Sequence, residues 1–173
     1  MGQRLQTVVK ARYSRGDRAS LSLAKRHVRY AVHRTDERGQ SQYREVYDRD
    51  GRLSKLEAYE RLDQAGKRAY VYRLTLSPHP EYQDREHGLD LQAWARDVMA
   101  QLDEAAGKPV EWFAVTHYNA DHRHVHVVAI SPRRLEVDQL SAMREAGDVS
   151  AQAQQRELEQ QPALARRGLE ASW

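Results

Sequence analysis

The chain has 173 residues, of which 40% are hydrophobic and 31% charged, which suits one modest core under a heavily charged surface. No apolar run approaches the ~20 residues needed to cross a bilayer. The N-terminus lacks the apolar stretch of a secretion signal. The absence of cysteine excludes disulfides and thiolate metal sites. We therefore expect one cytoplasmic domain without membrane insertion.

The net charge of +3 conceals two halves of opposite sign. Residues 1–73 contain 18 Lys and Arg against 9 Asp and Glu, whereas residues 74–173 contain 10 against 16. A basic half indicates an anionic partner, commonly nucleic acid, although a solvated basic surface fits the charge alone equally well.

The first half of the chain is predicted to begin with a strand over residues 3–13. Apolar residues then recur at spacings of three and four over about residues 21–34, which predicts a helix with Ser20 as its candidate N-cap. The polar segment 35–52, rich in Asp, Arg and Gly, indicates a long loop. A short helix is expected over 54–64, where leucine and tyrosine recur at spacings of three.

The middle of the chain contains the clearest strand signals. Residues 69–77 alternate in polarity and are rich in β-forming side chains. An amphipathic helix follows, capped by Asp90 and ended at Gly107. Two further strands, over 110–118 and 122–131, are separated by only a few residues, which predicts a hairpin.

The end of the chain is predicted to be less ordered. A last helix is expected over about residues 135–146, and residues 149–173 are interpreted as a polar C-terminal helix or tail behind a single domain of residues 1–148. The order of the elements predicts an α+β fold, in which a mainly antiparallel sheet carries the hairpin and helices pack on one of its faces.

The hairpin carries four of the eight histidines of the chain within ten residues. Because side chains alternate along a strand, His124 and His126 point to the same face, and a turn before them brings His117 back beside His124. A lone histidine in a strand is usually structural, but three convergent imidazoles favour a metal site, with positions left open for a substrate oxygen. His122, nearest the turn, ranks below these three as a ligand, and Asp121 is either an orienting residue or part of the turn.

The segment that contains these histidines resembles the histidine motif of the HUH endonucleases, in particular the conjugative relaxases of the plasmid mobilisation type. Residues 25–30 (Lys-Arg-His-Val-Arg-Tyr) resemble the family's helix with the catalytic tyrosine, and Tyr30 is the matching position. The strand that ends at Ser77-Pro78 resembles the motif in which a serine contacts DNA near the nick. A helix containing residues 94–99 precedes the hairpin, as in the family, and the resemblance covers about residues 5–147.

The resemblance implies site- and strand-specific nicking and rejoining of single-stranded or melted origin-of-transfer DNA during plasmid mobilisation. One divalent metal ion, held by His117, His124 and His126, would polarise the scissile phosphate, and Tyr30 would attack it to form a covalent 5′-phosphotyrosine. Relaxases use Mn or Mg, and a three-histidine site also accepts Ni, Co or Zn. The resemblance further implies a bacterial or archaeal cytoplasm and accessory mobilisation or secretion-coupling proteins. The sequence identifies no dedicated general base for the tyrosine.

DNA contacts are expected from the basic half of the chain and from the serine motif. Tyr118, Trp112 and Tyr72 are candidates for stacking on unpaired bases, although a place in the core or the sheet is the favoured interpretation of each. The predicted DNA-binding residues are Ser77, Arg12, Lys25, Arg26 and Arg29, with Lys10, Arg15 and Arg18 as further basic residues of the same half.

Several alternatives stay open at this point. Tyr43 and Tyr47 have the spacing of a two-tyrosine helix face, as in some HUH replication and transposition enzymes, although their surroundings indicate a loop. An alternative function is that of a replication initiator or a transposase nuclease rather than a mobilisation enzyme. Other possibilities are a non-catalytic metal-stabilised DNA-binding module, a hydrolase in which the metal activates water, and the nuclease domain of a longer protein.

Overall fold

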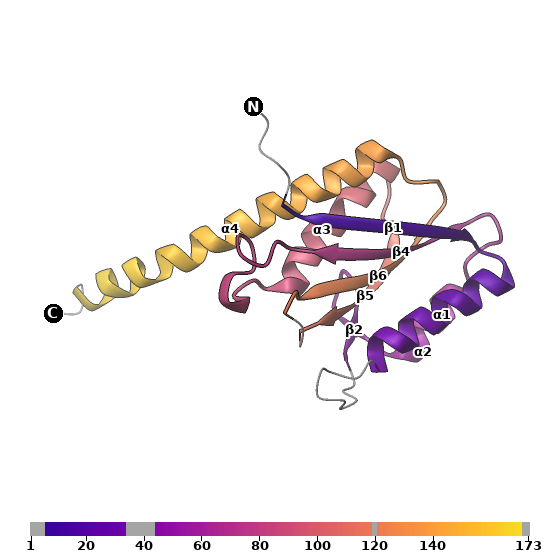
Figure 1. The fold of residues 1–173 in the computed structure, drawn as a ribbon, viewed down its shortest axis with the longest axis horizontal. Coiled ribbons are helices and arrows are strands. Elements are labelled where there is room, and N and C mark those ends of the chain that lie inside the picture. The colour runs from indigo at the N-terminus through magenta and orange to yellow at the C-terminus, as the bar shows by residue number, and fades with distance from the viewer. Residues whose placement is uncertain (1–5, 34–43, 119–120, 171–173) are drawn as a thin grey trace.

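A computed structural model describes residues 6–33, 44–118 and 121–170, with side chains described up to residue 161. Its centre is a six-stranded antiparallel sheet in the order β1-β4-β6-β5-β2-β3 (Figure 1). The predicted α+β class is therefore confirmed. The strands are β1 (Val8–Arg15), β2 (Val46–Tyr47), β3 (Arg52–Leu53), β4 (Tyr70–Ser77), β5 (Glu111–His117) and β6 (His124–Ser131).

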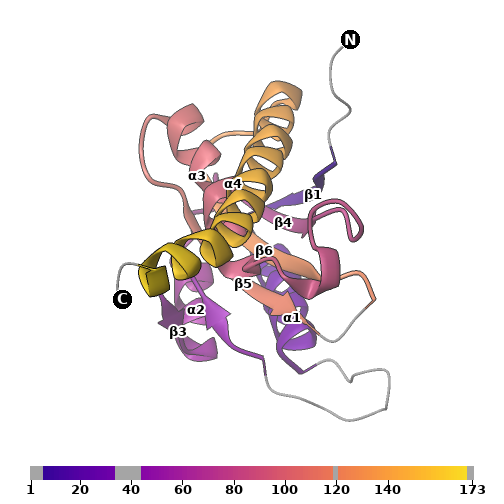
Figure 2. The ribbon, with the colours of Figure 1, turned by 90° about the vertical axis from the view of Figure 1, so that its left-hand side faces the viewer.

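Helices cover both faces of the sheet. α3 (Leu91–Ala106) and α4 (Val137–Glu170) lie on one face, whereas α1 (Arg18–His33) and α2 (Lys55–Asp63) lie on the other (Figures 1 and 2). The expectation of helices on one face is wrong, because the central strands bury both of their faces. Val127 packs in the α3/α4 core and the next residue, Val128, packs in the α1/α2 core.

The helix boundaries follow local capping chemistry. The predicted cap Asp90 accepts a hydrogen bond from the Ala93 amide at the start of α3, and Gly107 ends that helix with a φ of 67°. The helix predicted over about residues 21–34 is present as α1, but its predicted cap is wrong: the helix begins at Arg18, before Ser20, and the Asp17 carboxylate accepts the Ser20 amide at 2.8 Å. Asp17, rather than Ser20, therefore satisfies a donor of the first turn with its side chain.

The segment predicted as a long loop contains two short strands. Residues 34–43 lie outside the described residues, but β2 pairs with β5, with Val46 opposite Val115, and with β3. The turn between β2 and β3 is held by Asp48, whose Oδ1 accepts the amides of residues 50 and 51. Two-residue strands have too little periodicity to be predicted, and pairing with β5 supplies the hydrogen bonds that define them.

The last helix extends far beyond the predicted range. α4 runs without interruption through the position that we proposed as the domain boundary, and that boundary stays a prediction. Gly147 lies where the helix crosses the start of β1, and a Cβ there would lie 2.5 Å from the Thr7 side chain. The C-terminal part of α4 projects from the domain (Figure 1). Among the described residues, none of the helices has both the length and the apolar composition needed to span a membrane.

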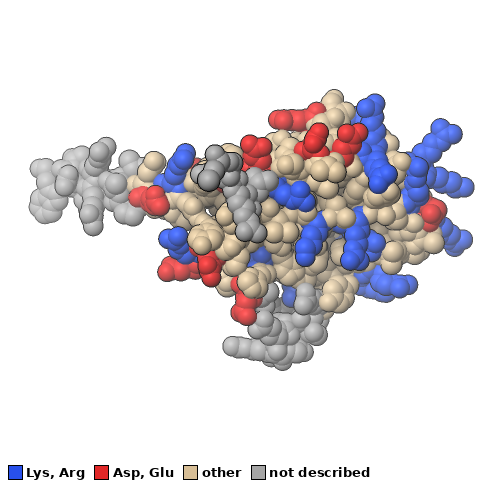
Figure 3. Space-filling view, turned by 45° about the horizontal axis from the view of Figure 1, so that its top comes forward, with Lys and Arg blue, Asp and Glu red and all other residues tan. Residues whose placement is uncertain are grey.

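The basic half of the chain produces a localised surface charge. Lys and Arg side chains gather at the end of the molecule where β1 ends and α1 begins, away from the projecting part of α4 (Figure 3). Basic residues in this part of the sequence include Arg15, Arg18, Lys67 and Arg68, all of which are exposed. Part of the positive charge of the first half of the sequence therefore lies at one end of the fold.

Candidate metal centre

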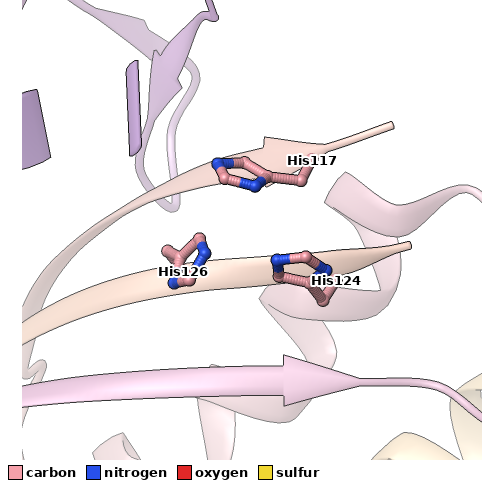
Figure 4. Close-up of side chains that lie close together, drawn as sticks. All are labelled: His117, His124 and His126. Atoms are coloured by element: carbon pink, nitrogen blue, oxygen red, sulfur yellow. The ribbon is translucent and has the colours of Figure 1, made fainter. Parts of the chain in front are cut away.

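Three histidines converge at the end of the β5–β6 hairpin. His117, the last residue of β5, lies directly opposite His124 in the register, and His126 lies on the same face two residues along β6 (Figure 4). The ring centroids form a nearly equilateral triangle with sides of 4.6, 4.9 and 4.9 Å. The predicted three-histidine cluster is confirmed, and it faces α1 and α2.

Backbone carbonyls orient two of these imidazoles. Nε2 of His117 lies 3.0 Å from the carbonyl oxygen of Ala31 in α1, and Nδ1 of His124 lies 2.9 Å from that of His122. Because a carbonyl only accepts, these nitrogens carry the protons, which leaves Nδ1 of His117 and Nε2 of His124 as acceptors for a metal. Main-chain atoms, rather than the exposed Asp121, therefore orient the candidate ligands.

The cluster has the donor set of a metal site. One nitrogen from each histidine lies within 4.8 Å of the others. A tetrahedral ion with bonds of about 2.1 Å holds its ligand nitrogens about 3.4 Å apart, so small side-chain rotations bring this set to binding distance. Strand pairing fixes the backbone on which those rotations occur, so the three residues fit a bound divalent ion.

The predicted nucleophile Tyr30 belongs to the turn of α1 that packs on this cluster. It precedes Ala31, whose carbonyl contacts His117, and it lies three residues after His27, whose ring centroid is 5.2 Å from that of His126. The side chain of Tyr30 is 56% exposed. This part of α1 therefore combines a contact to the histidines with a solvent-accessible tyrosine.

The strands beside the hairpin place further predicted residues on the face of the histidines. In the β4–β6 register Thr75 pairs with His126, so Ser77 reaches the level of His124. On the edge strand β1, Val9 and Ala11 pack in the α3/α4 core, and alternation turns the exposed Arg12 to the opposite, histidine-bearing face. Both residues thus share the face of the candidate centre.

The three basic residues predicted on α1 differ in their surroundings. Arg26 and Arg29 are exposed, and Arg26 lies one turn before Tyr30. Lys25 forms an ion pair with Asp63 of α2, and its ammonium lies 5.9 Å from the ring of Tyr59. The DNA-binding role of these side chains stays a prediction, and Lys25 would have to exchange a carboxylate for a phosphate.

Two residues beside the centre were not singled out from the sequence. His27 contacts His126, and burial, followed by the charge of Arg73, lowers the pKa of His27. Nε2 of His27 and Nε of Arg73 are both buried, and neither has a hydrogen-bond partner among the described residues. His27 lies one turn before Ala31 in the sequence. This position indicates a contact with the histidines only when α1 is known to pack on the hairpin.

A buried ion pair anchors the hairpin from its other face. Arg123 lies between His122 and His124, and its side chain binds the carboxylate of Asp84 and the carbonyl of Leu89. The side chain of Arg123 therefore points to the α3/α4 layer, whereas that of the next residue, His124, points to the candidate centre on the opposite face. Asp84 was not recognised in the sequence because its partner lies 39 residues away.

The structure does not support the two-tyrosine alternative. Tyr47 lies on β2 rather than on a helix, is 1% exposed, and makes a 2.7 Å hydrogen bond with the hydroxyl of Thr116. Burial raises the pKa of Tyr47 well above its ordinary value. Tyr43 lies outside the described residues.

The three candidates for base stacking differ in how exposed their rings are. Trp112 is buried, and Tyr72 is buried with its hydroxyl accepting the Leu135 amide at 2.6 Å. Tyr118 is exposed at the end of the hairpin, where the guanidinium of Arg123 lies 5.8 Å from its ring. Of the three, only Tyr118 is available to an unpaired base.

An antiparallel sheet whose hairpin carries three convergent histidines is the arrangement expected of an HUH nuclease. Residues 26–161 match the family described as relaxase: MobA/VirD2-like, nuclease domain, and since this match covers more than half of the chain, the chain belongs to that family. Comparison with curated proteins and with solved structures gave no match. The matched residues include Tyr30, Ser77 and the three histidines, whereas Arg12 and Lys25 precede them.

Proposed function

We propose that this relaxase domain nicks and rejoins one strand of origin-of-transfer DNA through a covalent bond to Tyr30. The observation that carries the proposal is the packing of α1 on the three-histidine cluster, with the exposed Tyr30 next to Ala31. A nucleophile and a phosphate-binding centre are thereby held on adjoining elements of one rigid scaffold.

Each residue of the site has a separate role in the proposed reaction. His117, His124 and His126 would hold a divalent ion, with Mn or Mg as the ions in use and Ni, Co or Zn as further candidates, and the ion would withdraw charge from a non-bridging phosphate oxygen. Arg26, one turn from Tyr30, would contact a phosphate of the bound strand by its charge. Ser77 offers a hydroxyl for a neighbouring phosphate or base, at the level of His124.

The reaction exchanges one phosphodiester bond for another. The Tyr30 oxygen forms a bond to phosphorus, the bond from phosphorus to the 3′ oxygen breaks, and that oxygen leaves as a 3′-hydroxyl that carries a proton. The phenol's own proton passes to solvent, because Tyr30 is exposed. Since the bonds made and broken are similar, the 3′-hydroxyl can attack the phosphotyrosine in the reverse direction and rejoin the strand.

The test is a denaturing gel with 5′- and 3′-labelled single-stranded oligonucleotides tiled over the DNA around the gene, incubated with Mn²⁺ or with EDTA. We expect an SDS-resistant adduct on the 3′-labelled fragment in Mn²⁺, none in EDTA, and none with Tyr30→Phe. Tyr82→Phe is the matched control, because Tyr82 is 57% exposed, almost the same as Tyr30, and lies in the turn that follows β4 rather than on α1.

Each alternative has its own outcome in this experiment. An adduct of normal yield with Tyr30→Phe overturns the assignment of the nucleophile. Metal-dependent cleavage without any adduct indicates hydrolysis by activated water, and binding of every oligonucleotide without cleavage indicates a non-catalytic module. Accessory mobilisation or secretion-coupling partners are tested separately by capture on the tagged chain.

A further inference from the structure

A cluster of arginines and tyrosines lies at the end of the sheet away from the histidines. The guanidinium of Arg15 lies 4.2 Å from the ring centroid of Tyr70, and that of Arg134 lies 5.1 Å from that of Tyr13. The Tyr13 ring in turn lies 5.6 Å from that of Tyr70. We call Tyr13, Arg15, Tyr70 and Arg134 the distal basic surface.

The neighbouring loop adds positive charge and a hollow. Residues 132–136 connect β6 to α4, and a hollow of about 400 Å³ is lined by Lys108, Arg133 and Arg134, among others. The loop is fixed by two contacts, from the Leu135 amide to the Tyr72 hydroxyl and from the Ser131 hydroxyl to the carbonyl of residue 133. The arginines therefore project from a held backbone, beside the positive N-terminal end of α4.

The distal basic surface lacks the carboxylates that neutralise cations elsewhere on the molecule. Lys25, Arg49, Arg61 and Arg123 each form an ion pair with an aspartate. Within the described part of the chain, neither Arg15 nor Arg134 forms an ion pair with an acidic side chain, and both are exposed. The arginines of the distal basic surface instead lie over aromatic rings, and Nη1 of Arg15 also donates to the carbonyl of Arg68 at 3.4 Å. The remaining N–H donors of these guanidinium groups can bind an anion.

The geometry points to a second DNA-binding site: we propose that the distal basic surface binds the phosphodiester backbone of the DNA strand held at the histidine centre. This inference rests on the proposed function. Tyr70 and Ser77 are the two ends of β4, and Ser77 lies at the level of His124, so the surface and the centre are about 24 Å apart along the strand and lie on opposite faces of the sheet. That distance corresponds to roughly 7 nucleotides at the spacing of one strand of B-form DNA.

The edge strand β1 provides a path between the two sites. Lys10 and Arg12 are exposed and alternate toward the histidine face, whereas Tyr13 and Arg15 lie at the end of the same strand and alternate toward the α3/α4 face. β1 pairs only with β4 among the described strands, so its outer edge is not covered by another strand. DNA that passes around this open edge would contact Lys10 and Arg12 on the histidine face and then the distal basic surface on the other face.

The size of the effect follows from counterion release. Each phosphate that is neutralised on a single strand adds about 0.7 to the slope of log K against log salt. Removing two contacts with Arg15→Gln/Arg134→Gln should therefore reduce the slope by about 1.4 and weaken binding about 25-fold at 0.1 M salt. Arg15→Lys/Arg134→Lys keeps both charges and should keep the slope.

The experiment measures the anisotropy of labelled dT30 and of a labelled 20-base-pair duplex between 50 and 300 mM KCl. Arg85→Gln/Arg156→Gln is the charge-matched control, since both arginines are exposed, lie elsewhere in the chain, and form no ion pair within the described residues. A smaller slope on either probe with Arg15→Gln/Arg134→Gln, but not with the control, supports the inference. Equal slopes for the two glutamine pairs on both probes overturn it.

These results are separable from those that test the nucleophile. Binding of dT30 requires no covalent step, so Tyr30→Phe should keep the full salt slope. If the distal variant changes the slope but no adduct is ever found, the proposed chemistry is wrong and the second site stands. If the adduct forms but the slope is unchanged, the second site is wrong and the chemistry stands.

Discussion

The ion pair between Arg123 and Asp84 should be among the most costly side-chain contacts to break in this domain. The two side chains are 8% and 3% exposed, and two hydrogen bonds join them while a third connects Arg123 to the Leu89 carbonyl at 2.9 Å. Arg123→Met leaves the Asp84 carboxylate buried without its cationic partner, with the Leu89 amide as its remaining donor, which costs about 3–5 kcal/mol. For a chain of this length the melting temperature should fall by roughly 6–20 °C.

Replacing both partners should be much less harmful than replacing one. Asp84→Leu/Arg123→Met removes both charges, and the remaining cost is that of the Leu89 amide and carbonyl, which lose their partners. At about 1 kcal/mol for each lost bond, the double variant should be destabilised by about 2 kcal/mol, less than either single variant. Urea unfolding followed by circular dichroism measures all three values in one cycle.

The same variants test whether the ion pair positions the metal ligands. Arg123 is flanked by the residue that orients His124 and by His124 itself, so a loosened hairpin should weaken Ni²⁺ binding about 10–100-fold. Calorimetry is performed at a temperature where the variant is fully folded. A single variant that loses under 1 kcal/mol would refute the energetic argument, and unchanged Ni²⁺ affinity would show that the pair contributes to stability alone.

Three further outcomes follow from contacts away from the hairpin. Tyr47→Phe should cost about 1–2 kcal/mol in urea unfolding, because the buried Thr116 hydroxyl loses its partner, without any change in adduct yield. Gly147→Ala should cost about 1–3 kcal/mol because the new methyl group meets Thr7, and a second change, Thr7→Ala, should restore part of this loss. Burial lowers the pKa of His27 below its unfolded value of about 6.5, so the unfolded state binds the proton more tightly and stability falls as the pH drops through 6.5 toward the folded pKa. His27→Gln should flatten the change in melting temperature between pH 7.5 and 5.5 in EDTA, and a slope equal to that of the wild type would contradict this assignment.

The elements that the sequence predicted well are those with strong local signals. Alternation in β4, the caps of α3 and the short connection of the β5–β6 hairpin are properties of neighbouring residues. The three histidines belong to this group, because one hairpin register determines their convergence. The sequence therefore predicted the candidate ligands without knowledge of the rest of the fold.

The features that were missed depend on distant partners. β2 exists because β5 pairs with it, and the contact of His27 with His126 requires α1 to cross the hairpin. α4 continues past its predicted end because α3 supplies partners, such as Asp97 for the Ser150 hydroxyl. Such contacts join residues about 50 to 100 positions apart, where the periodicity of a local segment carries no information.

The carbonyls that orient His117 and His124 have a consequence for how the site responds to mutation. Because these acceptors belong to residues 31 and 122, every amino acid at those positions retains them. A saturation scan would therefore report only side-chain size and helix preference there, and would assign both positions to structure. The backbone path of α1 and of the turn determines how these imidazoles are oriented. The orientation can therefore be retained when many side chains are substituted, whereas a movement of α1 relative to the hairpin changes it.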